Sequence, residues 1–347
     1  MTNLLKDIRT MIMAAGEGTR LRPLTYFVPK PLVPVVNRPA TDWLINHLQM
    51  QGITEIAMNV CMHTEKVIAH YGDGSKFNVS LRYSREENLL GTAGGVKKLQ
   101  SFLAKGTSLI LSGDGLTDMD FEKLLQFHRK NKALATIVLK PVQQRFEYGV
   151  VLCDNDFRIT NFVEKPHWGD VFANTVNTGI YVLEPEVFDF IPKDKFYDFG
   201  HQLWPELLKT GQPLYGYTMA EAWYDVGNLQ EYRNVHHAIL SGEIHLTPNG
   251  KEVKPGLWVE GGAGIVDGLN IETPAAIGKN CHIASSARIK KFSVLGNDVE
   301  IGENTKIEES ILWEGVKVGQ GTRLFNCIVR SGVNVPSGMV IHNAVLV

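Results

Sequence analysis

The sequence has few cysteines, no long apolar run and no excess of charge of either sign. Its 347 residues include 4 cysteines, none in a C-x-x-C pair, so neither a zinc site nor a disulfide framework is expected. The formal net charge of −2 argues against a nucleic-acid-binding protein, which usually carries a basic excess. No apolar run is long enough to span a membrane, and the first residues lack the apolar core of a secretory signal. We therefore expect a cytoplasmic enzyme with neither nucleic acid nor a membrane among its partners.

Two common nucleotide-binding signatures are also missing from the glycine-rich start of the chain, M-A-A-G-E-G-T-R-L-R-P-L-T at Met13–Thr25. A dinucleotide-binding G-x-G-x-x-G would need glycine at Leu21, and a Walker A loop would need G-K-[ST]. The segment does place Gly16 and Gly18 after an apolar run, where backbone N–H groups can approach phosphate oxygens. Three basic residues and one acidic residue between Gly16 and Lys30 give a local charge of 3 − 1 = +2. These features predict a phosphate-binding loop.

Over roughly the first 240 residues, short apolar runs alternate with amphipathic segments, which is typical of an α/β fold with a largely parallel sheet. The predicted strands are Thr10–Ala15, Glu55–Val60, Val79–Tyr83, Ser108–Leu111 and Ala133–Leu139, and the predicted helices are Thr41–Met50, His63–Tyr71, Thr92–Leu103 and Phe121–Lys130. In such sheets ligands bind beyond the carboxyl ends of the strands. The loops that follow Ala15 and Leu111 should therefore lie on one rim.

The last part of the chain has a different period, because an aliphatic residue recurs at every sixth position. The ten positions are Val253, Val259, Ile265, Ile271, Ile277, Ile283, Ile289, Leu295, Ile301 and Ile307. A period of six fits neither a helix nor a simple strand and predicts a β-helix of hexapeptide repeats. We expect one domain over residues 1–240, a Gly- and Pro-containing linker over 241–255 and the β-helix over 256–347.

The glycine-rich string, with P-K-P-L-V-P after it, resembles the signature of the sugar-1-phosphate nucleotidyltransferases. Further segments resemble this family in its order: L-G-T-A-G-G (Leu90–Gly95), S-G-D-G-L-T-D (Ser112–Asp118), E-Y-G-V-V (Glu147–Val151), F-V-E-K-P (Phe162–Pro166), N-T-G-I-Y-V-L (Asn177–Leu183) and W-Y-D-V-G (Trp223–Gly227). The E-K-P-H-W-G-D-V-F and F-G-H-Q-L-W-P-E-L-L stretches look like the mannose-1-phosphate guanylyltransferase branch. Glu17 and Tyr224 depart from the residues usual in that family. The resemblance implies a Rossmann-like mixed, mostly parallel sheet domain followed by a left-handed parallel β-helix.

The resemblance also implies a reaction, a metal ion and a set of site residues. GTP and mannose-1-phosphate would give GDP-mannose and pyrophosphate with the help of Mg²⁺. The implied catalytic residues are Arg20, Lys30, Asp114 and Asp225, the last two also holding the metal. The implied nucleotide-binding residues are Ala14, Ala15, Gly16, Gly18, Thr19, Gly91, Thr92 and Ala93, and those for the sugar phosphate are Gly149, Glu164, Lys165, Asn177 and Thr178.

Several alternatives remain open from the residues alone. The substrates could instead be glucose-1-phosphate with UTP or dTTP, or another sugar phosphate with GTP. A non-catalytic subunit that only binds nucleotide-sugars would be expected to lack one of the charged groups, and an acyltransferase site in the β-helix would want a longer helix and a suitably placed histidine. We expect the β-helix to be structural and to join copies of the chain into a homo-oligomer, because its open ends and the aromatic residues Trp258, Phe292, Trp313 and Phe325 need cover.

Overall fold

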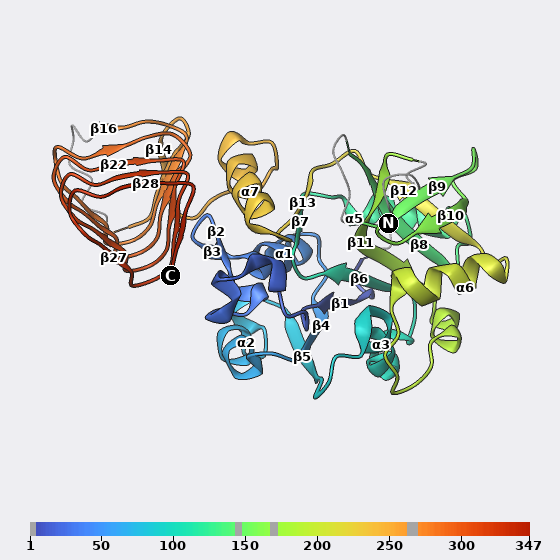
Figure 1. Cartoon of the computed structure of the whole chain (residues 1–347). Helices are drawn as coiled ribbons and strands as arrows, with labels where there is room; N and C mark the ends of the chain where they lie inside the picture. The colour runs from blue at the N-terminus through green and yellow to red at the C-terminus, as the bar shows by residue number, and fades with distance from the viewer. Residues whose placement is uncertain (1–4, 143–147, 167–172, 262–269) are drawn as a thin grey trace. The chain divides into compact units, whose positions relative to one another are not determined.

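The computed structural model describes residues 5–142, 148–166, 173–261 and 270–347. The chain forms two compact units (Figure 1). The first unit comprises Met1–Glu17, Pro29–Pro31 and Thr41–Asp225, and the second comprises Gly18–Val28, Leu32–Ala40 and Val226–Val347. The glycine-rich segment and its P-K-P continuation are therefore shared between the two units. No helix among the described residues has the length and apolar character needed to cross a membrane.

The first unit is built on a nine-stranded mixed sheet. Its strands are β1 (Arg9–Met13), β4 (Glu55–Val60), β5 (Ser80–Arg85), β6 (Ser108–Ser112), β8 (Ala135–Pro141), β9 (Val150–Cys153), β10 (Ile159–Val163), β11 (Thr175–Leu183) and β12 (Leu214–Thr218). The order is β10-β9-β11-β6-β1-β4-β5, with β8 between β11 and β12. Strands β6, β1, β4 and β5 are parallel, as are β8 and β12. Strand β11 runs antiparallel to β6, β8 and β9, so it separates the parallel strands β6, β1, β4 and β5 from the parallel pair β8 and β12.

Helices pack on this sheet and bury its apolar side chains. They are α1 (Ala40–Met50), α2 (Thr64–Tyr71), α3 (Gly91–Lys98), α4 (Gln100–Leu103), α5 (Phe121–Lys130) and α6 (Trp204–Lys209), with a π-helical turn at Phe199–Leu203 and 3-10 turns at Ser75–Phe77 and Pro185–Phe190. Two further 3-10 turns, Thr19–Leu21 and Leu24–Tyr26, belong to the second unit, and a third, Lys30–Leu32, has residues in both. The predicted helix over 92–103 is broken at Leu99 into α3 and α4. The core includes Met11 and Ile110 from the sheet and the fully buried Trp204 from α6.

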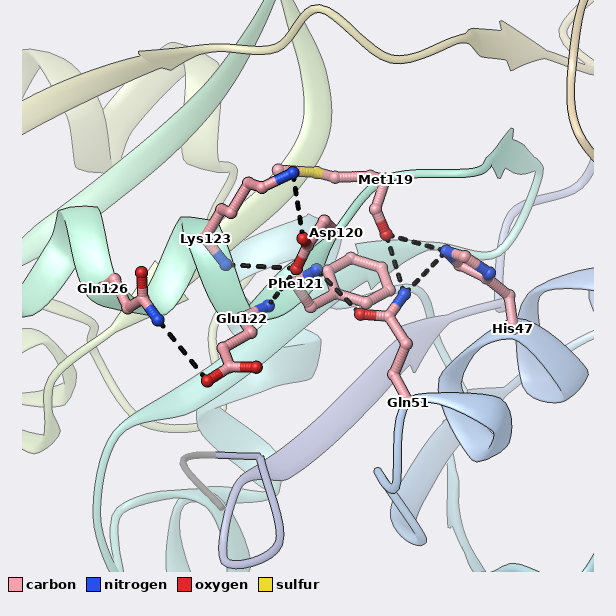
Figure 2. A network of polar contacts seen from close by, with 8 residues as sticks. All are labelled: His47, Gln51, Met119, Asp120, Phe121, Glu122, Lys123 and Gln126. Carbon is pink, nitrogen blue, oxygen red and sulfur yellow. Dashed lines mark hydrogen bonds and ion pairs between the residues drawn. The ribbon is translucent and has the colours of Figure 1, made fainter. Parts of the chain in front are cut away.

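A polar network joins the end of α1 to the start of α5 (Figure 2). The Gln51 amide donates to the Met119 carbonyl at 2.8 Å and accepts from the Phe121 N–H at 2.9 Å. Asp120 caps α5 by accepting from the N–H groups of Glu122 and Lys123, which satisfies two donors that the first helical turn leaves unpaired. The network fixes the chain just after the short strand β7 (Gly115–Thr117), which pairs antiparallel with β13 (Trp223–Asp225).

The second unit contains α7 (Leu229–Ser241), the small pair β2 (Pro34–Val35) and β3 (Arg38–Pro39), and the β-helix. One sheet of the β-helix has the order β14 (Lys251–Lys254), β15 (Leu257–Val259), β17 (Ala275–Ile277), β20 (Ser293–Leu295), β23 (Ile311–Leu312), β26 (Ile328–Val329) and β29 (Val345–Leu346). A second has β16 (Asn270–Ile271), β19 (Arg288–Ile289), β22 (Lys306–Glu308), β25 (Arg323–Phe325) and β28 (Val340–His342). The third has β18 (His282–Ile283), β21 (Glu300–Ile301), β24 (Lys317–Val318) and β27 (Asn334–Val335).

Most of the predicted hexad positions do line the interior of the β-helix. From Ile271 to Ile307 each of the seven is at most 9% exposed. Ile271, Ile289 and Ile307 stand in register on neighbouring strands, 18 residues apart, and Leu324 follows 17 residues later. The prediction that Val253 fills the interior is wrong. This residue is 57% exposed on β14, which pairs antiparallel with β15 as one strand of a hairpin. Ile265 lies outside the described residues.

Aromatic residues of the β-helix are covered by α7 within the same unit. The Trp313 indole donates to the Tyr232 hydroxyl at 2.9 Å, and that hydroxyl donates to the Pro34 carbonyl at 2.5 Å. The Phe292 ring stacks on His237 with centroids 4.2 Å apart. These two aromatic residues, which we expected to need a partner copy, are thus covered by their own chain.

Candidate functional site

The ends of β1 and β6 lie side by side and carry the first part of the candidate site. Met13 pairs with Ser112, the last residues of these two parallel strands. The Gly113 N–H then donates to the Met13 carbonyl at 2.9 Å. The loops that follow β1 and β6 therefore leave the sheet at one edge, as predicted from the strand pattern.

Asp114 is the centre of a charged cluster at this edge. The Lys30 ammonium and the Ser112 hydroxyl each contact one oxygen of its carboxylate. Asp225 is brought beside it by the pairing of β13 with β7, where Asp225 is opposite Gly115, and its carboxyl group interacts with that of Asp114. Asp225 is only 8% exposed. The structure thus brings together three of the four predicted catalytic residues.

The charge state of Asp114 follows from these contacts. Burial acts to raise the pKa of its carboxyl group. The Lys30 ammonium is the strongest opposing influence, and with the hydrogen bonds it lowers the pKa to about 2. Asp114 is therefore ionised at neutral pH.

The donor set at this edge is small. Among the described residues no group of three or more His, Cys, Asp or Glu side chains could hold a metal ion. Two adjacent carboxylates remain, Asp114 and Asp225. Magnesium characteristically takes one or two protein carboxylates and completes its shell with water and substrate phosphate oxygens, so the pair fits that ion.

The predicted nucleotide-binding loops begin with backbone that is already fixed. The Ala14 N–H donates to the Asn59 side chain at 2.7 Å, Ala15 is buried, and Gly16 is exposed. Gly18 has the left-handed φ of 66° and precedes the 3-10 turn Thr19–Leu21. Its carbonyl accepts from the Thr25 hydroxyl at 2.8 Å. Gly18, Thr19 and Arg20 belong to the second unit, where Thr19 and Arg20 are exposed.

The segment 91–93 packs against the π-helical turn. Gly91 has φ 75°, and a Cβ there would lie 2.6 Å from the Tyr197 carbonyl oxygen, so only glycine fits. The Thr92 hydroxyl donates to Asp198 at 2.8 Å and accepts from the Phe199 N–H at 2.9 Å. Ala93 is completely buried. This loop is held by its neighbours on the side away from solvent.

The residues predicted to bind the sugar phosphate occupy different environments. Glu164 lies against Gly149, where a Cβ would be 2.8 Å from its carboxylate, and burial followed by the charge of Asp198 raises the pKa of Glu164. Lys165 is exposed. The Asn177 amide donates to the Tyr181 hydroxyl at 3.0 Å and accepts from the Gly179 N–H at 3.0 Å.

Thr178, the last of this group, is 3% exposed, and its hydroxyl donates to the Val138 carbonyl at 2.9 Å. Its side chain therefore joins β11 to β8 inside the sheet. Glu147 of the E-Y-G-V-V segment and the H-W-G-D-V-F stretch at 167–172 lie outside the described residues.

Three residues that the sequence analysis did not select take part in the same region. Asp198 binds Thr92 and caps the π-helical turn by accepting from the N–H groups of Gly200 and His201. Asn59 and Glu86 are buried polar side chains joined by a hydrogen bond of 2.8 Å. A polar residue inside the apolar strand Glu55–Val60 was the available signal for Asn59, because buried amides need partners.

A mixed α/β sheet with charged loops at its strand ends, followed by a β-helix, is the architecture expected of the nucleotidyltransferases that the sequence resembles. The chain belongs to the nucleotidyl transferase family, whose profile matches residues 9–242. Residues 254–347 match the family described as EIF2B subunit epsilon LbH domain.

Individual relatives belong to the sugar-1-phosphate branch of this family. The UTP–glucose-1-phosphate uridylyltransferase of Synechocystis sp. is 35% identical over 88% of this chain and 83% of its own length. The mannose-1-phosphate guanylyltransferase of Mycobacterium tuberculosis is 30% identical over 82% of this chain and 78% of its own length. The crystal structure of HddC from Yersinia pseudotuberculosis superposes with a TM-score of 0.59 at 23% identity, over 66% of this chain and 98% of that one, which shows a shared fold.

Proposed function

We propose that this enzyme makes GDP-mannose and pyrophosphate from GTP and mannose-1-phosphate. The observation that carries the proposal is the Lys30–Asp114–Asp225 cluster at the sheet edge, formed within a chain of this family. The guanylyltransferase of M. tuberculosis supports the choice of substrates, since it matches over both parts of the chain.

The reaction joins two polyanions, so neutralisation of charge dominates its barrier. A phosphate oxygen of the sugar phosphate attacks the α-phosphorus of the nucleotide and forms a new P–O bond. The bond from the α-phosphorus to the bridging oxygen breaks, and pyrophosphate leaves with that electron pair. The attacking phosphate is already ionised, so the chain needs to supply no general base.

Each predicted residue has a role in this scheme. Lys30 neutralises charge on the α-phosphate, and Arg20 neutralises the leaving pyrophosphate. The backbone of Gly16, Gly18 and Thr19, with Ala14 and Ala15 before them, surrounds the triphosphate. The small residues Gly91 and Thr92 leave room for the base, and the buried Ala93 packs behind them. Gly149, Glu164, Lys165 and Asn177 form the sugar-phosphate side, and Thr178, whose hydroxyl donates to the Val138 carbonyl, supports it from within the sheet.

The proposed metal ion is Mg²⁺, held by Asp114 and Asp225. Two neighbouring carboxylates in a largely buried position would favour a divalent cation between them, because the cation would offset their mutual repulsion. When bound, the ion withdraws charge from phosphate oxygens. In its absence Lys30 is the group that holds Asp114 ionised.

A second candidate is the transfer of UMP from UTP to glucose-1-phosphate. It is favoured by the Synechocystis relative, which is 35% identical over 88% of the chain. Synthesis of dTDP-linked sugars from dTTP, or of other GDP-linked sugars from GTP, would use the same cluster. A non-catalytic role is opposed by the presence of Lys30, Asp114 and Asp225 in one cluster.

A substrate matrix tests these proposals. The purified chain is offered ATP, CTP, GTP, UTP and dTTP against mannose-, glucose- and galactose-1-phosphate, and pyrophosphate release is followed. The highest kcat/KM with GTP and mannose-1-phosphate supports the main proposal, and with UTP and glucose-1-phosphate the second. No turnover with any pair contradicts both.

The remaining proposals concern organisation. We retain a catalytic domain at 1–240, a linker at 241–255 and a β-helix at 256–347, supported by family matches that end at 242 and begin at 254. We also retain a homo-oligomer joined through the β-helix and a cytoplasmic location. Exposed Met339, Val340 and Val347 on the last coil support the oligomer.

A further inference from the structure

A buried polar pair lies beneath the two loops that the proposed function assigns to the nucleotide. Asn59 on β4 is 4% exposed, and Glu86, directly after β5, is 5% exposed. The Asn59 amide nitrogen donates to one carboxylate oxygen of Glu86 at 2.8 Å. Neither side chain has a role in the chemical step described above. Buried polar groups of this kind are retained only where their hydrogen bonds are satisfied.

Each member of the pair binds the backbone of one loop. The Asn59 amide oxygen accepts from the Ala14 N–H at 2.7 Å, two residues before Gly16. The second carboxylate oxygen of Glu86 accepts from the Leu90 N–H at 3.1 Å, one residue before Gly91. We call residues 14–19 the triphosphate loop and residues 90–93, which lead into the first turn of α3, the base loop. A continuous line of three hydrogen bonds therefore runs from the start of the triphosphate loop to the start of the base loop.

Gly95 provides an independent indication that this pair is a built feature. A Cβ at this position would lie 2.7 Å from the Glu86 carboxylate oxygen and 2.8 Å from the Asn59 amide nitrogen. Real side chains essentially never approach so closely. The glycine in α3 thus leaves the space that the pair occupies.

We propose that Asn59 and Glu86 are positioning residues, which set the spacing between the triphosphate loop and the base loop before the nucleotide binds. This inference rests on the proposed function, because that function places the nucleotide on these loops. The pair orders both loops in the free enzyme, so binding does not have to supply the cost of ordering them. The pair acts through the backbone of Ala14 and Leu90 and does not touch the substrate.

An exchange of polarity between the two positions provides the test. Asn59→Asp sets two carboxylates against each other, and Glu86→Gln sets two amide nitrogens against each other. In the double variant N59D/E86Q the new carboxylate accepts from the Ala14 N–H and from the new amide. The oxygen of that amide accepts from the Leu90 N–H, so all three hydrogen bonds are restored without a change of size.

We expect each single variant to raise KM for the nucleotide about tenfold or more, as for the loss of one hydrogen bond to a charged group. KM for the sugar phosphate should stay within about twofold, and the double variant should recover nucleotide KM to within about threefold. Asn155→Asp and Glu186→Gln make the same charge changes at exposed positions and serve as controls. A role in stability alone would lower Tm and leave nucleotide KM unchanged.

Equilibrium binding of Mg-GTP and of Mg-UTP, without sugar phosphate, separates this inference from the proposed reaction. If the wild type turns over no sugar phosphate, a tenfold loss of nucleotide affinity in the single variants still supports the pair, and unchanged affinity overturns it. A wild type that binds neither nucleotide overturns both proposals.

A variant that acts through size alone tests the proposal if Asn59→Asp or Glu86→Gln does not fold. Gly95→Ala should weaken nucleotide binding by displacing the pair, whereas Gly106→Ala, with nothing within 4 Å of the added carbon, should not. Equal affinities in these two variants, or a double variant N59D/E86Q no better than the worse single, would overturn the proposal.

Discussion

Lys30 and Asp114 are in direct contact although 84 residues separate them in the sequence. The contact places a cation from the P-K-P segment on a carboxylate at the end of β6, beside Asp225 from β13. A lysine beside two carboxyl groups keeps Asp114 ionised, with its pKa lowered to about 2. A phosphate that enters this edge meets a cation and an anionic pair that can hold a second cation.

Asp114→Asn should lower kcat by about a hundredfold or more, because a metal-binding and charge-pairing group is lost from the transition state. The folded chain should remain, since the amide can still accept from the Ser112 hydroxyl. Pyrophosphate release at saturating substrates measures the effect. Asp156→Asn, at an exposed turn, is the matched control. A kcat within twofold of wild type would remove Asp114 from the mechanism.

Asp225→Asn should raise the Mg²⁺ concentration needed for half-maximal rate by about tenfold or more, since one of two protein ligands is lost. Removal of the metal with a chelator should abolish turnover in both proteins, and added Mg²⁺ should restore it. The measurement is a Mg²⁺ titration of the initial rate at fixed nucleotide. An unchanged titration curve in the variant would contradict the metal assignment.

Much of the fold could be predicted because it depends on local patterns. Glu55–Val60 and Phe121–Lys130 were predicted with the bounds the structure has, since the first is a short, mostly apolar run and the second has apolar residues at helical spacing. The stacking of Ile271, Ile289 and Ile307 follows from the period of six. Val253 has the residue type and spacing of the repeat but not its buried position, because it lies on β14, a hairpin strand that exposes it.

Features that depend on distant pairings could not be predicted. Strand β11 runs antiparallel beside β6, and nothing within 175–183 encodes that partner. The break at Leu99 between α3 and α4 has no proline or cap signal. Asn59 carries only the weak signal of a polar residue in an apolar strand and Glu86 carries none, and the pairing of β4 with β5 brings the two together. The motifs identified the residues that carry charge, but not those that hold the loops.

Thr92→Val should raise KM for the nucleotide several-fold, because its hydroxyl both donates to Asp198 and accepts from the Phe199 N–H. Valine keeps the shape and leaves that N–H without its acceptor, at a cost of about 1–3 kcal/mol. Thr92→Ser retains the hydroxyl and is the matched control. Steady-state kinetics with varied nucleotide distinguish the two. Equal KM values for the valine and serine variants would show that these hydrogen bonds do not order the base loop.

Glu164 should make stability depend on pH in a direction opposite to that of most carboxylates. Burial, followed by the charge of Asp198, raises the pKa of Glu164 in the folded state. A raised pKa means that this group stabilises the fold below its unfolded pKa, and that the contribution is lost as the pH rises through the folded pKa. Glu164→Gln is neutral throughout and lacks this loss.

The difference in Tm between Glu164→Gln and wild type should therefore move in favour of the variant as the pH rises from about 4 to about 7. Thermal unfolding at several pH values measures it. Glu186→Gln makes the same substitution at an exposed position and is the matched control. Parallel profiles for wild type and Glu164→Gln would mean that the carboxyl group has the same pKa in both states.

Val340→Lys should dissociate the proposed oligomer. Strands β27, β28 and β29 are the last described strands in the order of the three β-helix sheets. Val340 on the last coil is 61% exposed beside Met339, and a lysine there would set like charges against each other in any contact between two such ends.

Light scattering after gel filtration should give a multiple of the chain mass for wild type and the mass of one chain for the variant. Met50→Lys, at an 80% exposed position on α1, should leave the wild-type mass unchanged. A single-chain mass for wild type at micromolar concentration would contradict the oligomer, and an unchanged multiple in Val340→Lys would place the contact elsewhere.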